Sequence, residues 1–191
     1  RDLVLEKNPK DFDVVTDATP EQIKKAISRS RIIGRRFKLV HVRKGRKITE
    51  VSTFRSKGGK RTSKTNKGIV LRDNFYGTIR EDAFRRDFTI NSLYLDISDM
   101  KIIDYTGGFI DLNNRELSCI GDSKLRFRED PIRIIRALRF LSNLDLKLKK
   151  SLKKDLINFA HLLQEIPPAR RYEEILKLFL TGNAKNNFIA L

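Results

Sequence analysis

Two aspartates lie two residues apart in the run PKDFDVVT over residues 9–16. Carboxylates at this spacing could bind a cation together. The β-branched end of this run predicts a strand, so Asp11 and Asp13 would project from one face while Phe12 and Val14 point into the core. Adjacent carboxylates repel each other unless a cation lies between them. Mg²⁺ prefers such hard oxygen ligands and normally brings phosphates with it. The pair alone is equally compatible with an exposed strand whose acids are solvated.

A third acid, Glu50, lies in the middle of a predicted strand over residues 48–54. A turn at residues 44–46 joins this strand to another over residues 37–42, and together they predict an antiparallel hairpin. An acid in a central strand needs a compensating charge. A bound metal ion would supply one, and so would an ion pair with a surface arginine, and the residues leave both open.

The composition indicates a globular chain with a polyanionic partner. Of 191 residues, 41 are Lys or Arg and 24 are Asp or Glu, which gives a formal net charge of +17. This surplus suits nucleic acid first and an acidic membrane second. No apolar run approaches the roughly 18 residues that span a bilayer, and Cys119 is the only cysteine. We expect no membrane partner and a reducing, cytoplasmic location.

A basic stretch over residues 55–72 contains seven Lys or Arg, no acid and three glycines. A solvated connector has this composition, and so does a loop that follows the phosphates of a nucleic acid. If the second interpretation holds, the candidate nucleic-acid-binding residues are Lys57, Lys60, Arg61, Lys64 and Lys67.

The pattern becomes helical beyond Gly121. A helix that opens at Asp130-Pro131 has an apolar stripe at helical spacing, formed by Ile134, Ile135, Leu138 and Leu141. Residues 146–166 predict a second amphipathic helix. Two prolines at 167–168 begin a third, which we expect to end at Gly182 and to bury Ile175, Leu176, Phe179 and Leu180.

Five motifs, taken in order, carry a family resemblance. They are PKDFDV (9–14), EVSTFR (50–55), RRDFTINS (85–92), DYTGG (104–108) and REDPIR (128–133). Together they resemble the class II tRNA nucleotidyltransferase and bacterial poly(A) polymerase family, within the DNA polymerase β superfamily.

The resemblance implies an α+β fold in two domains. A nucleotidyltransferase head, with a small mixed or antiparallel sheet flanked by helices, would occupy residues 1–115. An all-α neck would occupy residues 116–191. We expect both to be incomplete, because the family places a glycine-rich turn before the position of Arg1 and an RNA-binding body after that of Leu191.

The implied activity is template-independent addition of AMP from ATP to RNA 3′ ends, with two Mg²⁺ ions. Two stretches, residues 32–42 and 166–178, are similar to the poly(A) branch of the family. A CCA-adding tRNA nucleotidyltransferase is the alternative, and an RNA-binding module without catalysis is a second one. The resemblance indicates RNA and ATP as partners and names no protein partner.

The resemblance also assigns roles to individual residues. The implied catalytic residues are Asp11, Asp13, Glu50 and Asp87, of which the first three would hold metal. The implied nucleotide-binding residues are Arg85, Arg86, Asn91, Asp130, Arg133, Arg136 and Arg139.

Competing interpretations stay open for several of these residues. Asp130 and Arg133 are one helical turn apart and would read the base, but Asp130 also suits a helix cap and Arg133 an ion pair with a nearby acid. Asp87 would otherwise pair with one of the two arginines that precede it. Arg136 and Arg139 have nucleotide contact and a structural role as alternatives.

Overall fold

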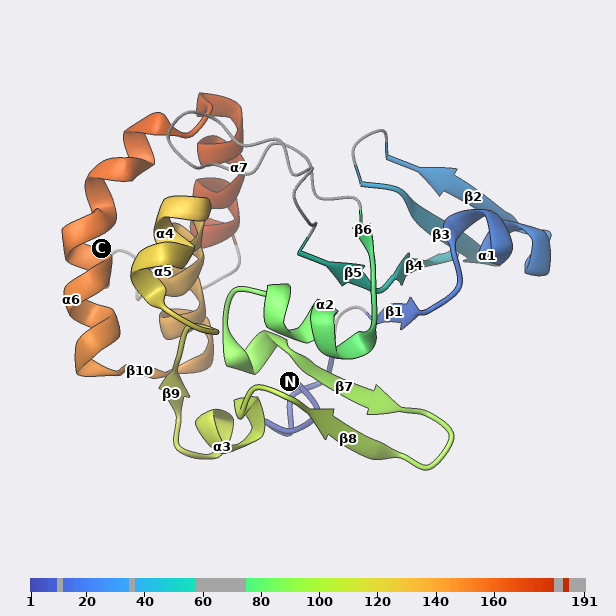
Figure 1. The fold of residues 1–191 in the computed structure, drawn as a ribbon, viewed down its shortest axis with the longest axis horizontal. Helices are drawn as coiled ribbons and strands as arrows, with labels where there is room; N and C mark the ends of the chain where they lie inside the picture. Colours follow the sequence, from blue (N-terminus) through green and yellow to red (C-terminus); the bar gives the residue numbers. More distant parts are fainter. Residues whose placement is uncertain (10–11, 35–36, 58–74, 181–183, 186–191) are drawn as a thin grey trace. The chain divides into compact units, whose positions relative to one another are not determined.

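The computed structural model describes residues 1–9, 12–34, 37–57, 75–180 and 184–185. Residues 2–85 of this set pack together as one unit, here called the sheet unit. Arg1 and residues 86–185 form a second, here called the helical unit (Figure 1).

A four-stranded mixed sheet forms the centre of the sheet unit. Its strand order is β1 (Asp13–Thr16), β4 (Lys47–Thr53), β3 (Leu39–Lys44) and β2 (Ser30–Ile33). β1 runs parallel to β4, and the other pairs are antiparallel. The predicted hairpin is therefore confirmed as β3–β4, and β2 is a strand that the sequence did not predict.

The core of the sheet unit lies under one face of this sheet. Ile23 of α1 (Pro20–Ala26) packs with Val40 and Val51. Thr19 and Gln22 close a capping box at the start of α1, which satisfies backbone N–H groups that a helix leaves unpaired.

The prediction that Phe12 and Val14 point into the core is wrong. Phe12 is 63% exposed and Val14 is 43% exposed. The reason is the position of β1 at the end of the described sheet, where only β4 pairs with it. A side chain on an end strand has a neighbour on one side only, so an apolar residue there is covered less than one on β3 or β4.

Two short strands and a helix complete the sheet unit. β5 (Arg55–Ser56) pairs antiparallel with β6 (Phe75–Tyr76), and α2 (Ile79–Arg85) follows. The backbone N–H of Gly77 donates to the carbonyl of Phe54 (2.9 Å) and extends this pairing.

The helical unit begins with a short 3₁₀ helix and a hairpin. η1 (Thr89–Asn91) leads into β7 (Leu93–Asp96), which pairs antiparallel with β8 (Lys101–Asp104). After the hairpin, Asp104 accepts backbone hydrogen bonds from Thr106, Gly107 and Phe109, each at 2.9 Å. These bonds shape the turn that starts α3 (Gly108–Asn113).

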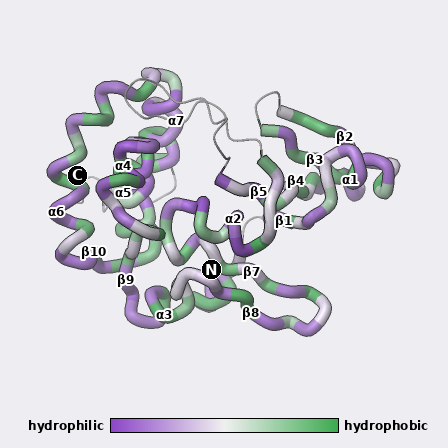
Figure 2. Tube along the Cα trace, in the orientation of Figure 1, coloured by the Kyte–Doolittle hydropathy of each residue, from purple (hydrophilic) through white to green (hydrophobic). Residues whose placement is uncertain are grey.

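The rest of the helical unit is mainly α-helical. β9 (Glu116–Leu117) leads to α4 (Ser123–Glu129) and α5 (Ile132–Leu144), and β10 (Lys147–Leu148) leads to α6 (Lys150–Phe159), η2 (Ala160–Glu165) and α7 (Pro168–Phe179). Apolar and polar residues alternate in blocks along these helices (Figure 2), as in amphipathic helices that cover a core. No helix in the described ranges is long and apolar enough to cross a membrane.

Two predictions for this helical part are wrong. Residues 146–166 do not form one helix, because Lys147–Leu148 pairs as a strand with β9 and the chain tightens to a 3₁₀ helix after Phe159. On α7, Ile175 and Leu180 are exposed and the buried residues are Glu174 and Leu178. A charged residue replaces an apolar one there because Glu174 faces arginines of α5.

Gly34 and Gly45 offer a matched test of backbone geometry. Both have positive φ, +84° and +61°, which costs an L-residue free energy. A Cβ on Gly34 would also lie 2.1 Å from the carbonyl oxygen of Phe37, whereas one on Gly45 would meet nothing within 4 Å.

We expect Gly45→Ala to lower the free energy of unfolding by about 1–2 kcal/mol, and Gly34→Ala to lower it by about 1–3 kcal/mol more. Urea unfolding of both variants measures the difference, and equal losses would contradict the steric argument.

Candidate active site and nucleotide-facing residues

The exposed face of the sheet unit carries two of the predicted metal-binding carboxylates. Asp13 on β1 and Glu50 on β4 are Cα partners in the parallel pairing of these strands. Residues that oppose each other on adjacent strands point to the same face, and both are exposed. The structure therefore brings Asp13 and Glu50 together, whereas Asp11 lies outside the described residues.

Glu50 contacts a histidine rather than the surface arginine that one interpretation suggested. His41 opposes Glu50 on β3, and its Nε2 atom lies 3.2 Å from Glu50 Oε1. The Glu50 side chain is 54% exposed, so water competes for this contact and it adds little stability. Glu50 can therefore exchange His41 for a cation at little cost.

The acids on this face suit a hard divalent cation. Carboxylate oxygens are the ligands that Mg²⁺ prefers, and the neighbours of Glu50 that face the other way, Val51 and Thr53, are at least nine-tenths buried. Within the described ranges, no three His, Cys, Asp or Glu side chains are grouped so that they could hold a metal ion. The described face thus supplies two carboxylates, and Asp11 remains the predicted third.

Asp87 is a buried acid of the helical unit, and its carboxylate has three donors. Oδ1 accepts from the backbone N–H of Phe88 (2.8 Å) and from Nδ2 of Asn91 (3.1 Å), and Oδ2 accepts from Nε of Arg136 (2.7 Å). Burial by itself would raise the pKa of Asp87, but the charge of Arg136 and these hydrogen bonds hold it below its ordinary value. Asp87 is therefore ionised inside the unit.

The two arginines that precede Asp87 bind other groups, so the alternative in which one of them pairs with that acid is wrong. Arg85 donates to Asp82 (3.0 Å) within the sheet unit. Arg86 donates to the carbonyl oxygen of Asn91 (2.9 Å), and its guanidinium lies over the ring of Tyr94, 5.0 Å from the centroid.

Arg136 and Arg139 of α5 are held by Glu174 of α7. Glu174 lies 3.9 Å from Arg136 NH1 and 3.5 Å from Arg139 NH2, and it also pairs with Lys177 at 2.9 Å. Both guanidinium groups also lie over the ring of Phe140. These contacts favour the structural interpretation of the two arginines.

Asp130 is the C-cap residue of α4 and not the N-cap of α5, so the interpretation as a cap at the start of the helix is wrong. The residue at the cap of α5 is Pro131, and no side chain bonds to the helix start there. Asp130 Oδ2 accepts from Arg170 NH2 (2.7 Å). Its other oxygen, Oδ1, is buried and has no hydrogen-bond partner within the described part of the chain. A buried acceptor without a donor costs free energy, so a ligand that brought a donor to Oδ1 would remove this cost.

Arg133 points back along the preceding helix. Its NH1 atom donates to the carbonyl oxygen of Arg126 (2.7 Å) and pairs with Glu129 (3.3 Å). The ion pair with a nearby acid is thus confirmed as a contact. Although Asp130 and Arg133 are one helical turn apart in sequence, they bind partners on different elements.

Of the predicted RNA-binding residues, Lys57 is described and is exposed. The others, Lys60, Arg61, Lys64 and Lys67, lie outside the described residues.

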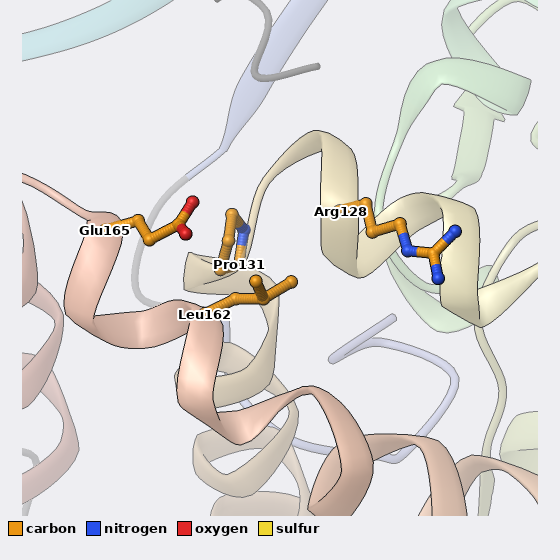
Figure 3. A pocket seen from close by; sticks show the side chains of 4 residues that line it. All are labelled: Arg128, Pro131, Leu162 and Glu165. Atoms are coloured by element: carbon orange, nitrogen blue, oxygen red, sulfur yellow. The ribbon is translucent and has the colours of Figure 1, made fainter. Parts of the chain in front are cut away.

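A small pocket in the helical unit involves none of the predicted residues. It has a volume of about 230 Å³ and is lined by Arg128 at the end of α4, by Pro131, and by Leu162 and Glu165 of η2 (Figure 3). This volume is below the range of about 300–1,000 Å³ that is typical of small-molecule sites.

Among the residues that contact the predicted set and that sequence reasoning missed are His41, Arg170 and Glu174. Arg170 is separated from Asp130 by 40 residues, and Glu174 belongs to a different helix from the arginines it binds. The spacing of residues along the sequence does not predict such pairs. His41 had a weak signal, since the predicted hairpin places it on the strand beside Glu50.

Comparison with known proteins places these motifs in a family. The description "Poly A polymerase head domain" matches residues 1–118, and "Probable RNA and SrmB-binding site of polymerase A" matches residues 145–191. Poly(A) polymerase I of Salmonella typhi is 48% identical over 96% of this chain. The CCA-adding enzyme of Lactobacillus helveticus is 33% identical over 98% of it.

The fold agrees with these matches. The crystal structure of the Bacillus stearothermophilus CCA-adding enzyme in complex with CTP superposes with a TM-score of 0.85 at 30% identity, over 100% of this chain and 45% of that one. The chain spans 41% of the S. typhi protein and 46% of the L. helveticus protein. The α+β fold and the resemblance predicted from the motifs are both confirmed. Because the head-domain description matches 118 of its 191 residues, the chain belongs to the poly(A) polymerase head domain family.

Proposed function

We propose that the protein containing this chain adds AMP from ATP to RNA 3′ ends without a template. The observation that carries this proposal is the in-register pairing of Asp13 and Glu50 on one exposed face, in a chain with 48% identity to a poly(A) polymerase I. The lower identity to a CCA-adding enzyme, 33%, supports the poly(A) branch. Since such a protein meets RNA and ATP inside the cell, we also propose a cytoplasmic location.

Asp13 and Glu50, together with Asp11, would hold Mg²⁺. The ion supplies Lewis-acid activation of the RNA 3′-hydroxyl and neutralises charge on the departing pyrophosphate. The residues supply the position, because Asp13 and Glu50 are held in register by two strands rather than by a loop.

The base is recognised, in this proposal, by Asp130 and Arg133. Arg170 holds one oxygen of Asp130, which leaves Oδ1 as a buried acceptor for an exocyclic amino group. Adenine and cytosine both carry such a group, so Asp130 alone does not separate the ATP and CTP branches. We propose Arg85, Arg86 and Asn91 as further nucleotide-binding residues, and Lys57 with the other four basic residues predicted above as RNA-binding ones.

Domain roles follow the family. We propose that residues 1–115 act as the catalytic head and residues 116–191 as the helical neck. Asp87, Arg136 and Arg139 then serve the nucleotide indirectly, by holding the elements that carry the contacting side chains.

The first prediction concerns the acids on β1. Asp13→Asn keeps the size of the side chain but removes its charge, so we expect AMP addition to fall by at least about 100-fold with an unchanged urea midpoint. Asp17→Asn is the matched control, because Asp17 is an exposed aspartate just after β1. Extension of a labelled RNA primer by the full-length protein measures both. Normal activity of Asp13→Asn would contradict the metal-binding role.

The second prediction separates the functional alternatives. Given ATP alone and a generic RNA primer, the full-length protein should add many adenosines. A CCA-adding enzyme would instead complete CCA on a trimmed tRNA, with good use of CTP, and then stop. A protein that binds the primer but adds no nucleotide would support the RNA-binding module. Gel electrophoresis of the products distinguishes the three outcomes.

The third prediction concerns pH and Asp87. A carboxyl whose pKa is lowered by folding stabilises the folded state above its unfolded pKa of 3.8, and this contribution is lost as the pH falls through the lower folded value. Arg136→Gln removes the charge that opposes burial, so the pKa of Asp87 should rise and the acid loss of stability should begin at a higher pH. Urea unfolding between about pH 3 and 7 tests this. An unchanged pH profile would show that Arg136 does not set the ionisation of Asp87.

A further inference from the structure

In the sheet unit, an arginine lies over one exposed aromatic ring and pairs through its backbone with the residue that carries a second. Arg55 on β5 and Tyr76 on β6 are cross-strand partners, and residues directly opposite each other in an antiparallel pair point to the same side. The guanidinium of Arg55 also lies over the ring of Phe37, 5.0 Å from the centroid. We call Phe37, Arg55 and Tyr76 the aromatic platform.

The two aromatic rings of the platform are exposed to solvent, although aromatic side chains are usually buried. Phe37 is 37% exposed and Tyr76 is 45% exposed. A single exposed aromatic side chain is common in folded proteins. Two of them gathered about one arginine, on neighbouring segments far apart in sequence, form a local surface that requires an explanation.

Charge around the platform favours an anionic partner. Lys38 follows Phe37 in the chain and is exposed, so it adds a positive charge beside the platform. Glu21 offsets Lys38 through an exposed ion pair at 3.0 Å, but such a pair is weak and exchanges readily with solvent ions. Arg55 has its planar group against Phe37 and therefore presents a cation beside a flat apolar surface.

Two glycines hold the platform in place. Gly34 has a φ of +84°, and a Cβ there would lie 2.1 Å from the carbonyl oxygen of Phe37. At the other end, a Cβ on Gly77 would lie 2.8 Å from Cβ of Ser56, the residue after Arg55. Side chains at these positions would push Phe37 or β5 away, so the close approach depends on glycine.

This arrangement matches the surfaces that bind single-stranded nucleic acid. Unpaired bases stack on aromatic rings and on arginine planes, while nearby cations attract the backbone. Phosphate contact alone would need only lysine and arginine, and would leave the exposed rings without a use. An unpaired base would contact the rings and the cation together.

We propose that the aromatic platform stacks unpaired bases of the single-stranded RNA that the protein extends. The identity of this ligand rests on the proposed function, since an enzyme that extends RNA 3′ ends must hold a single-stranded primer. It lies apart in sequence from Asp130 and Arg133, the residues proposed to read the incoming nucleotide, and it would bind RNA already made.

The test uses the full-length protein and two labelled probes of equal length, an oligoadenylate and an abasic ribose–phosphate oligomer. We expect Phe37→Leu and Tyr76→Ala each to weaken oligoadenylate binding by about 5- to 150-fold, the range for one lost base stack, and to leave the binding of the abasic oligomer unchanged. Phe84→Ala is the matched control. Phe84 is also an exposed aromatic of the sheet unit with an arginine, Arg80, over its ring at 5.8 Å, and we expect its loss to change neither affinity.

Any other outcome would contradict the proposal that the platform stacks bases. Equal losses on both probes would mean that the variants disturb charge or folding, and unchanged oligoadenylate affinity would mean that no base stacks there. Binding by Phe37→Tyr, which keeps a ring, should equal that of the unmutated protein. Primer extension by that unmutated protein is scored separately, so the proposed function can fail while the binding result still decides the platform. Where extension occurs, Phe37→Leu should raise the KM for RNA and leave the KM for ATP unchanged.

Discussion

The helical unit depends on an ion pair between the buried Asp87 and the partly exposed Arg136. Burying two charges costs several kcal/mol for each ion unless their hydrogen bonds are replaced. The donors on Asp87 come from Phe88, Asn91 and Arg136, and its backbone carbonyl accepts from Ile120 (3.0 Å). The pair therefore ties η1, the segment before α4 and helix α5 to one point. Removing the charge of Arg136 would leave the buried Asp87 without its ion-pair partner.

The same reasoning explains why positive charges gather around Phe140. Arg1, Arg136 and Arg139 all lie within 5.5 Å of its ring centroid. Guanidinium groups so close together repel one another, and the electron-rich face of the ring offsets only part of this. Glu174 supplies the missing negative charge, which accounts for a buried acid on α7 where an apolar residue would otherwise be expected.

The acids of the sheet unit are exposed, in contrast to the buried Asp87. Glu50 is 54% exposed and its contact with His41 is open to water, so neither group is committed in the way Asp87 is. A structural acid is best buried with fixed donors, whereas an acid that must accept and release a cation is best left exposed on a rigid strand. This contrast supports metal binding by Asp13 and Glu50, and a positioning role for Asp87.

The sequence by itself determined the family, the α+β class and the hairpin that carries Glu50, because motif order and strand alternation are local properties of the chain. It also predicted that Asp11 and Asp13 share one face of a strand, since side chains alternate with a period of two, whereas the pairing of Asp13 with Glu50 came from the tertiary structure. Tertiary structure decided the partners. His41 opposite Glu50, Arg136 on Asp87 and Arg170 on Asp130 are choices among many charged residues, and only the packing of distant elements selects one. The tertiary structure also decided which side chains are exposed. Because β1 lies at the end of the described sheet, its apolar side chains are uncovered, although alternation alone assigns them to the core.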